Sequence, residues 1–231
     1  VVAATLLTLE EDGSTCKDVR IGLGSVGPTP IRARRAEMIE AAVKHGVMPG
    51  PPPASEANTG DWKVPQVPED LKRPGIEISG PASITPMFIN ALNPGRDGKR
   101  AEGYLDDDED SAGHRLADTI IAAHNRLGAV DRSLGYVDPV RGKEYSIKDG
   151  VLPFFMHRDR ALHLDEPDLT VDGKPVPAAI LGTALTIFHA GRAQIERGQG
   201  LYFYLPKMEL VDEAVKLAPA RIEVQRSLGL Q

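Results

Sequence analysis

Three stretches of the chain change from apolar or aromatic residues to charged ones, and each is followed by a helix-like segment. They are Tyr104–Asp110, Phe154–Arg160 and Gly200–Met208. This order of strand, charged tip and helix is typical of a parallel α/β sheet or a (β/α) barrel. In such barrels the residues that bind and convert the substrate lie at the C-terminal ends of the strands. The functional residues are therefore expected at these three strand ends.

About four βα units are expected after residue 60. The strands are predicted at 76–81, 101–107, 151–156 and 201–205, and the helices at 84–92, 111–126, 178–196 and 211–228. The second helix is expected to bury Leu116, Ile120, Ile121 and its alanines on one face. A hairpin-like, hydrophilic stretch is expected at 135–150. Because a closed TIM barrel has about eight units, the predicted fold class is α/β, a partial TIM (β/α) barrel.

The N-terminal part of the sequence has a different pattern. Residues 1–9 are β-branched and apolar, 10–14 have the composition of a turn and 18–24 resume a strand, so 1–26 predict a β-hairpin, and 30–43 have the apolar spacing of a helix. Together they predict a small separate segment, 1–46. Residues 47–60 contain the run Pro49-Gly-Pro-Pro-Pro53 and read as a Pro-rich linker. The barrel-like part is then predicted to extend from 61 to 231.

Composition narrows the class of protein. The 231 residues are 41% hydrophobic and 26% charged, as in an ordinary globular domain, and the formal charge of −6 comes without a basic face that would bind nucleic acid. Cys16 is the only cysteine, which excludes an intrachain disulfide and suits the cytoplasm. No apolar run approaches the roughly 20 residues of a membrane span. Beginning at Val1, the chain is expected to be a piece of a longer sequence.

The densest charge run, 106–110, follows the second predicted strand. Read alone, it is a solvated acidic turn, or a set of carboxylates that cap a helix, orient an arginine or hold the water shell of a divalent cation. An EF-hand is excluded because the glycine and the terminal glutamate are not at the required spacing. Its place at the end of a buried strand favours a functional role.

The other two strand ends carry cations. Arg158 and its neighbours, 157–160, are suited to clamping a carboxylate substrate, with a structural Arg–Asp pair as the alternative. Lys207 is expected to point into the same opening. His163 and His189 are expected to be packed, hydrogen-bonded histidines rather than metal ligands, because neither has a second histidine three or four residues away. The aromatic run 202–204 is expected to line the barrel wall.

Several separate motifs are spread over roughly residues 55–231. They are Gly60–Val64, Ile76–Pro81, Ile89–Asn93, Asp107–Asp110, Val171–Pro175, Phe188–His189 and Gly200–Met208. Taken together, these motifs resemble malate synthase, a TIM-barrel enzyme of the glyoxylate cycle. The resemblance implies condensation of acetyl-CoA with glyoxylate, with Mg²⁺ as the cofactor, followed by hydrolysis of malyl-CoA to malate and CoA.

The resemblance also implies roles for single residues. The family's catalytic arginine corresponds to Arg158, which would polarise glyoxylate, and Asp107 would assist it as a catalytic carboxylate. Glu109 and Lys207 would contact the substrate. Glu109 and Asp110 would lie in the outer shell around the metal's water molecules. Asp159 stands where the family has proline, so the loop is expected to differ in shape.

In the family, the direct Mg²⁺ ligands and the catalytic base follow the last segment seen here. No metal ligand is therefore expected in this chain, and the polypeptide is expected to be inactive by itself. Two alternatives remain open. Residues 18–37 resemble the C-terminal domain of the FAD-carrying subunit of molybdenum hydroxylases, which makes the chain a piece of such a subunit. A half-barrel with two open sheet edges is also a candidate for a non-catalytic module that forms homo-oligomers.

Overall fold

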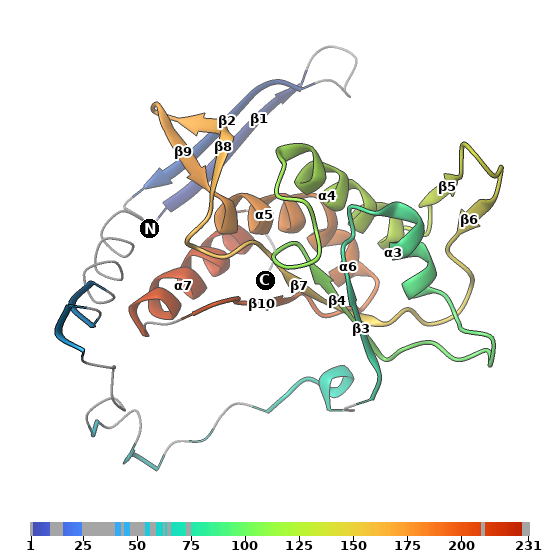
Figure 1. Cartoon of the computed structure of the whole chain (residues 1–231), viewed down its shortest axis with the longest axis horizontal. Coiled ribbons are helices and arrows are strands. Elements are labelled where there is room, and N and C mark those ends of the chain that lie inside the picture. Colours follow the sequence, from blue (N-terminus) through green and yellow to red (C-terminus); the bar gives the residue numbers. More distant parts are fainter. Residues whose placement is uncertain are drawn as a thin grey trace.

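The structure is a computed structural model of the whole chain (Figure 1). It describes residues 2–9, 16–24, 40–42, 44–46, 54–55, 59–61, 63, 66–72, 75–208 and 211–227. The predicted N-terminal hairpin is confirmed, because β1 (Val2–Leu9) and β2 (Cys16–Gly24) pair antiparallel. The predicted helix 30–43 and the linker 47–60 fall mostly outside the described residues, so the proposed domain boundaries stay predictions.

The predicted parallel sheet is confirmed in its four strands and their direction. These are β3 (Glu77–Gly80), β4 (Gly103–Asp107), β7 (Phe154–Arg158) and β10 (Tyr202–Tyr204), in the spatial order β10-β7-β4-β3. All neighbouring pairs are parallel. Four parallel strands, each followed along the chain by a helix, form the part of a TIM barrel that the sequence predicts.

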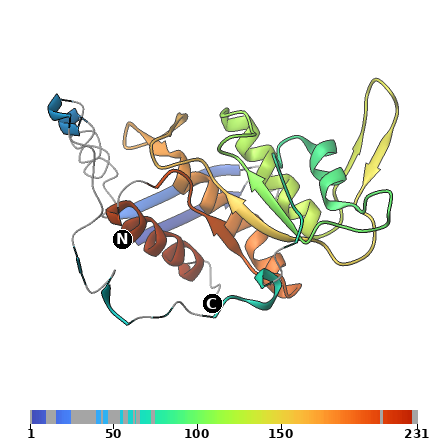
Figure 2. The ribbon, with the colours of Figure 1, turned by 60° about the horizontal axis from the view of Figure 1, so that its bottom comes forward.

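Helices cover one face of this sheet (Figure 2). They are α3 (Thr85–Leu92), α4 (Leu116–Val130) and a long helix that contains α5 (Ala178–Thr186), the π-helical turn η2 (Ile187–Gly191) and α6 (Arg192–Glu196). Phe88 of α3 packs against the sheet, with its ring centroid 5.1 Å from that of Tyr104 and 6.2 Å from that of Phe155. These aromatic contacts form the centre of the hydrophobic core between α3 and the strands.

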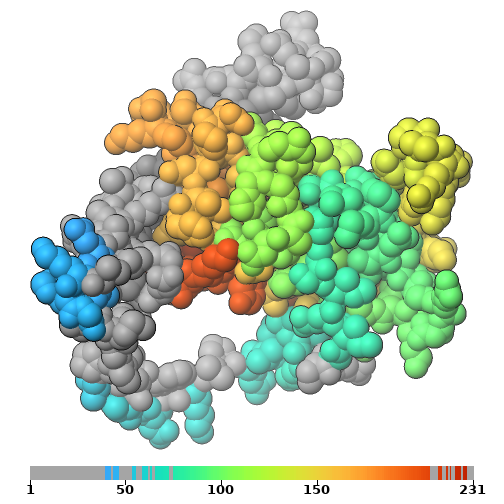
Figure 3. All heavy atoms as spheres, in the orientation of Figure 1, coloured from blue at the N-terminus to red at the C-terminus, as the bar shows by residue number. Residues whose placement is uncertain are grey.

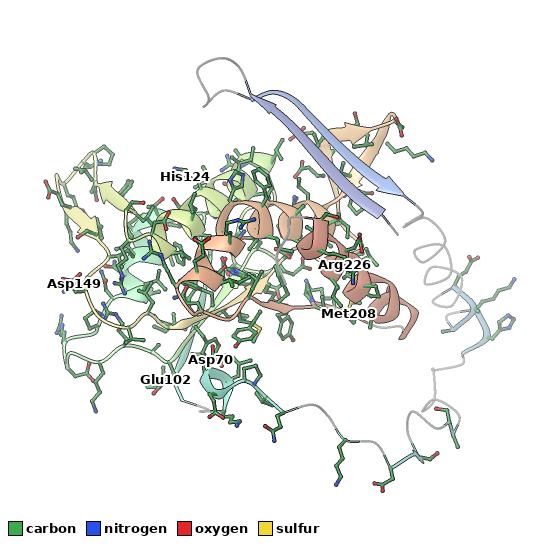
Figure 4. All side chains as sticks on the ribbon, turned by 180° about the vertical axis from the view of Figure 1, so that it is seen from behind. Asp70, Glu102, His124, Asp149, Met208 and Arg226 are labelled. Atoms are coloured by element: carbon green, nitrogen blue, oxygen red, sulfur yellow. The ribbon has the colours of Figure 1, made fainter. Side chains whose placement is uncertain are left out.

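The second face of the sheet has no helix layer among the described residues. Leu105, Met156 and Tyr202 lie side by side on it in register and are half-buried. A single 3-10 turn, η1 (Glu69–Leu71), approaches this face, and the Tyr202 hydroxyl donates a 2.7 Å hydrogen bond to Asp70 Oδ1 (Figure 4). The segment before β3 is therefore bound to β10, the last of the four parallel strands.

Two hairpins and a C-terminal helix complete the described part of the chain. β5 (Gly135–Val137) and β6 (Glu144–Ser146) form the expected hairpin. β8 (Asp165–Val171) and β9 (Lys174–Pro177) form a second hairpin, which is not among the predicted elements. Its atoms lie against those around α4 on the face shown in Figure 3. α7 (Val211–Ser227) packs on α5 through Leu217 and Ile180, near Met208 (Figure 4).

The predicted apolar face of α4 is partly wrong. Ile120 and Ile121 are 52% and 42% exposed, whereas Asn125 and Arg126 are buried. The helix also starts at Leu116 rather than at residue 111. The physical reason is a set of polar partners at the strand ends, which draw the polar side of this helix inward. None of the described helices has the length and apolarity to cross a membrane.

Candidate active site

The ends of β4 and β7 are aligned so that charged residues face each other in pairs. Asp106 lies beside His157 and Asp107 beside Arg158, while Tyr204 of β10 lies on the other side of Arg158. Successive side chains of a strand point to opposite faces of the sheet. The charged residues therefore separate into two clusters, one toward the open face and one toward the helices.

The rim cluster, on the open side, consists of Arg158, Lys207, Asp107, Glu109 and Asp110. Arg158 Nη1 lies 3.2 Å from Asp107 Oδ1, and its Nη2 lies 2.6 Å from Asp110 Oδ2. Lys207 Nζ lies 2.7 Å from Glu109 Oε1 and 2.8 Å from Asp110 Oδ1. The structure thus brings together all the residues for which the sequence predicted a catalytic, substrate-binding or outer-shell role.

Backbone contacts fix the buried acids of the rim cluster. Asp107 Oδ1 accepts hydrogen bonds from the backbone N–H groups of Glu109 and Asp110, both at 3.1 Å. Glu109 Oε2 accepts one from the backbone of Ala161 at 2.6 Å. The loops after β4 and β7 are therefore joined at this point, and these two carboxylates have little freedom to move.

Mutual attraction favours the charged forms of Asp110, Lys207 and Arg158. Hydrogen bonds from Lys207 and Arg158 lower the pKa of Asp110, and contacts with Asp110 and Glu109 raise the pKa of Lys207. Burial would lower the pKa of Arg158, but Asp110 and Asp107 outweigh it and raise the value. The Arg158 guanidinium also lies over the Tyr204 ring, 5.3 Å from its centroid. Arg158 is thereby held as a permanent cation at the C-terminal end of β7.

Lys207 reaches this position through an unusual backbone conformation. Its φ is 51°, in the left-handed region that residues other than glycine seldom adopt. Such a conformation persists where surrounding contacts over-determine it. The two carboxylates of Glu109 and Asp110 provide these contacts, so the turn after β10 is shaped around the ion pairs.

The buried cluster, on the helix side, consists of Arg126, Asp106, Asp108 and His157. Arg126 reaches from α4 and forms ion pairs with Asp106 and, at 2.6 Å, with Asp108 Oδ2. Its Nη1 donates to Thr186 Oγ1 at 2.9 Å. His157 Nδ1 lies 3.2 Å from Asp106 Oδ2, and its Nε2 lies 3.2 Å from Gln194 Oε1. All four members of the cluster are almost completely buried.

The two acids of the buried cluster have opposite pKa shifts. Burial would raise the pKa of Asp106, but Arg126 and His157 outweigh it and lower the value to about 2. Burial raises the pKa of Asp108 to about 7, because Arg126 opposes it only partly and the charges of Asp106 and Asp159 add to it. Asp106 is therefore the main counter-ion of Arg126.

The other two charged residues after β7 are used inside the protein. Arg160 Nη2 pairs with Glu166 Oε2 of β8 at 2.8 Å, and its Nη1 donates to the backbone oxygen of His114 at 3.2 Å. Asp159 accepts a 2.6 Å hydrogen bond from the hydroxyl of Thr183 on α5. Asp159 and Arg160 therefore have structural roles inside the protein, whereas the Arg–Asp pairs of Arg158 lie on the open side of the sheet.

The expectation that His163 and His189 are packed is wrong, because both are exposed, although the His189 ring contacts Phe188 edge-on. Among the described residues, the buried, hydrogen-bonded histidine is His157. Arg126 and Gln194 are two further residues of the strand-end clusters that were not predicted from the sequence. A signal was available for Arg126: the helix follows a strand that ends in five consecutive acids, so an arginine in its alanine-rich stretch has a counter-ion within reach.

The carboxylates at these strand ends do not fit a direct Mg²⁺ site. Each acid from Asp106 to Asp110 is engaged by an arginine, a lysine or backbone N–H groups. Within the described residues, no group of three or more His, Cys, Asp or Glu side chains is placed to hold a metal ion. The carboxylates of the rim cluster are thus paired with Arg158 and Lys207 rather than arranged around a common metal position.

The sequence of this chain is similar to those of known malate synthases. Residues 154–230 match the family model of the malate synthase TIM barrel domain. The malate synthase of Myxococcus xanthus (strain DK1622) is 33% identical over 199 residues, which are 83% of this chain and 35% of that protein. Most of this chain is homologous to malate synthase.

Other malate synthases agree with this result. The protein of Oryza sativa subsp. japonica is 35% identical over 170 residues, 72% of this chain and 28% of that protein. Malate synthase A of Escherichia coli (strain K12) is 34% identical over 154 residues, 67% of this chain and 27% of that protein. The chain thus spans about a third or less of the length of these malate synthases. Residues 1–42 match a different family, the CO dehydrogenase flavoprotein C-terminal domain.

Proposed function

We propose that the barrel part of this chain forms the glyoxylate-binding side of a malate synthase active site. The reaction is the condensation of acetyl-CoA with glyoxylate to malyl-CoA, which water then cleaves to malate and CoA. The observation that supports this most directly is the pairing of Arg158 with Asp107 at the carboxyl ends of β7 and β4. Homology to malate synthase over most of the chain supports the same choice of substrates.

Arg158 has two tasks in this proposal. Its guanidinium donates hydrogen bonds to glyoxylate, and it stabilises the negative charge that forms on the aldehyde oxygen as the new C–C bond is made. Fixed charges aimed at a developing oxyanion are among the strongest catalytic effects in proteins. Asp107, itself fixed by two backbone N–H groups, keeps the guanidinium in this orientation. Lys207 and Glu109 border the substrate on the side of β10.

The proposal assigns two parts of the reaction to groups outside the rim cluster. The Mg²⁺ that the resemblance implies would take its direct ligands elsewhere, and Glu109 and Asp110 would contact its water molecules only. The base that removes a proton from acetyl-CoA would also come from another part of the enzyme. We therefore expect the 231-residue chain to bind glyoxylate without releasing CoA.

Ligand titration tests the binding part of the proposal. NMR chemical shifts of the ¹⁵N-labelled chain would be followed with glyoxylate and with acetate, which lacks the oxo group. We expect saturable glyoxylate binding that Arg158→Gln weakens by at least about tenfold, because hydrogen bonds to charged groups are worth about 1.5–3 kcal/mol. Arg141→Gln, on the distant β5–β6 loop, is the charge-matched control. Equal binding by all three proteins would overturn the proposal.

Two other functions have one observation each in their favour. The match of residues 1–42 supports a piece of an FAD-dependent hydroxylase subunit, and flavin absorbance in the purified protein would reveal it. Among the described strands, β3 and β10 each have a single neighbour, which supports a homo-oligomeric module. A stable dimer with strong hydrogen-exchange protection at 77–80 and 202–204 would favour that alternative.

A further inference from the structure

We infer that Asp110 is an internal competitor of the substrate, and that its carboxylate occupies the position that the carboxylate of glyoxylate takes in the complex. This inference rests on the proposed function and adds to it a residue that sets the affinity for small 2-oxo acids. It begins from the difference between the two acids that contact Arg158.

Asp107 and Asp110 are held in different ways. The Asp107 side chain is 5% exposed and accepts two backbone hydrogen bonds, so it is a fixed part of the site. The Asp110 side chain is 50% exposed, and the contacts of its carboxylate are those with the cations Arg158 and Lys207. An exposed ion pair contributes little stability and exchanges readily. Asp110 is therefore the partner of Arg158 that another carboxylate can replace.

The exchange leaves the charges of the site balanced. When the Asp110 carboxylate turns away from both cations and toward water, including the metal-bound water that the proposed function assigns to it, Arg158 keeps Asp107 and Lys207 keeps Glu109, so no buried charge loses its partner. Two cations then face the position that Asp110 has left. A substrate carboxylate there regains the contacts with Arg158 Nη2 and Lys207 Nζ. The backbone of Asp110 stays in place because its N–H group remains bonded to Asp107.

Arg158 also has one N–H group that can donate a hydrogen bond to the oxo group of the substrate. Its Nε is buried and has no hydrogen-bond acceptor among the described residues. Asp110 engages the Nη2 atom, and the Tyr204 ring holds the plane of the guanidinium. A 2-oxo acid carries a second oxygen next to its carboxylate, which a simple carboxylate such as the Asp110 side chain lacks. This favours 2-oxo acids over acetate as the displacing ligand.

Glyoxylate affinity in an Asp110→Asn variant tests the inference. The amide keeps the size of the side chain but pairs more weakly with cations. We expect Asp110→Asn to bind glyoxylate roughly two- to fivefold more tightly, the range that corresponds to the loss of an exposed ion pair. Asp131→Asn is the matched control, because it also removes one negative charge from an exposed ion pair, with Arg197, but beyond the C-terminal end of α4. Its affinity should equal that of the unaltered chain.

The outcomes separate this inference from the proposed function. Binding that requires Arg158 but is unchanged or weaker in Asp110→Asn overturns the competitor role and leaves the proposed function standing. An absence of glyoxylate binding in both the unaltered chain and Asp110→Asn contradicts both. Tighter binding in Asp110→Asn that disappears in the Arg158→Gln, Asp110→Asn double variant supports both. Near-ultraviolet circular dichroism of each variant verifies that the fold is intact.

Discussion

Arg126 Nη2 of α4 lies 2.6 Å from Asp108 Oδ2 in the protein interior, while Asp107, the preceding residue, faces Arg158 on the opposite side of the strand end. One run of acids is thus shared between two arginines, one behind the sheet and one in front. The arginine behind the sheet neutralises the acids that would otherwise repel Asp107. The geometry of the rim cluster therefore depends on a helix residue that does not reach the open face.

Removal of Arg126 should destabilise the protein strongly. Arg126→Met leaves two buried carboxylates without their cation, and breaking a buried ion pair in this way costs about 3–5 kcal/mol. Urea denaturation at neutral pH measures the change in free energy of unfolding. Arg115→Met removes an exposed pair with Asp118 at the start of the same helix and should cost less than about 1 kcal/mol. Similar losses in both variants would contradict the role given to Arg126.

The stability of the protein should fall between weakly acidic and weakly basic pH. Asp108 has a folded-state pKa of about 7, above its ordinary value of 3.8. The folded state therefore binds this proton more tightly than the unfolded state, and the stabilisation is lost as the pH rises toward 7. Urea denaturation at about pH 5.5 and about pH 8 measures this slope, and Asp108→Asn should remove most of it. An unchanged slope in the variant would contradict the shift.

Asp106 should act in the opposite direction at lower pH. Its folded-state pKa of about 2 lies below the ordinary value of 3.8. The stability that it contributes is present above that ordinary value and is lost as the pH falls toward 2. Acid unfolding followed by circular dichroism should therefore begin at a higher pH in Asp106→Asn than in Asp131→Asn. Identical acid transitions would count against the pairing of Asp106 with Arg126.

The sequence predicted the strands and the rim cluster because their signals are local. An apolar run that ends in charges marks where a strand leaves the core, and parallel strands bring such ends together, so Arg158 and Asp107 could be placed at one edge. Which face of α4 is buried could not be predicted in this way. By residue type, Ile120 and Ile121 should be inside and Arg126 outside. The acids at the strand ends draw Arg126 inward and leave the two isoleucines outside. Their position next to α4 arises only in the tertiary structure, so local sequence signals do not show it.

Gly182 of α5 should not tolerate a side chain. A Cβ atom at this position would lie 2.9 Å from Asp159 Oδ1, and overpacking of this kind costs about 1–3 kcal/mol. In an ordinary helix the change from glycine to alanine stabilises by about 1 kcal/mol. The sign of the change in unfolding free energy for Gly182→Ala therefore shows whether the contact with Asp159 outweighs the helix propensity of alanine. A stabilised variant would show that α5 does not press on Asp159.

The bond between Tyr202 and Asp70 should hold the turn η1 against the sheet without supporting the whole fold. Burial, together with Asp70, raises the pKa of Tyr202 to about 12. Tyr202→Phe removes the hydroxyl donor, and we expect faster hydrogen exchange at 69–72 with an unchanged urea midpoint. Tyr136→Phe, on the β5–β6 hairpin, is the control. Unchanged exchange at 69–72 in Tyr202→Phe would show that other contacts hold the turn.

In the proposed function, residues 61–231 provide the arginine side of a malate synthase active site. The most direct measurement replaces the matching segment of the Myxococcus xanthus malate synthase with these residues and follows CoA release from acetyl-CoA, glyoxylate and Mg²⁺. We predict an active chimaera in which Arg158→Gln lowers kcat/KM by about a hundredfold or more, while Arg141→Gln leaves it unchanged. A folded chimaera that releases no CoA, or one that is indifferent to Arg158, would contradict the claim.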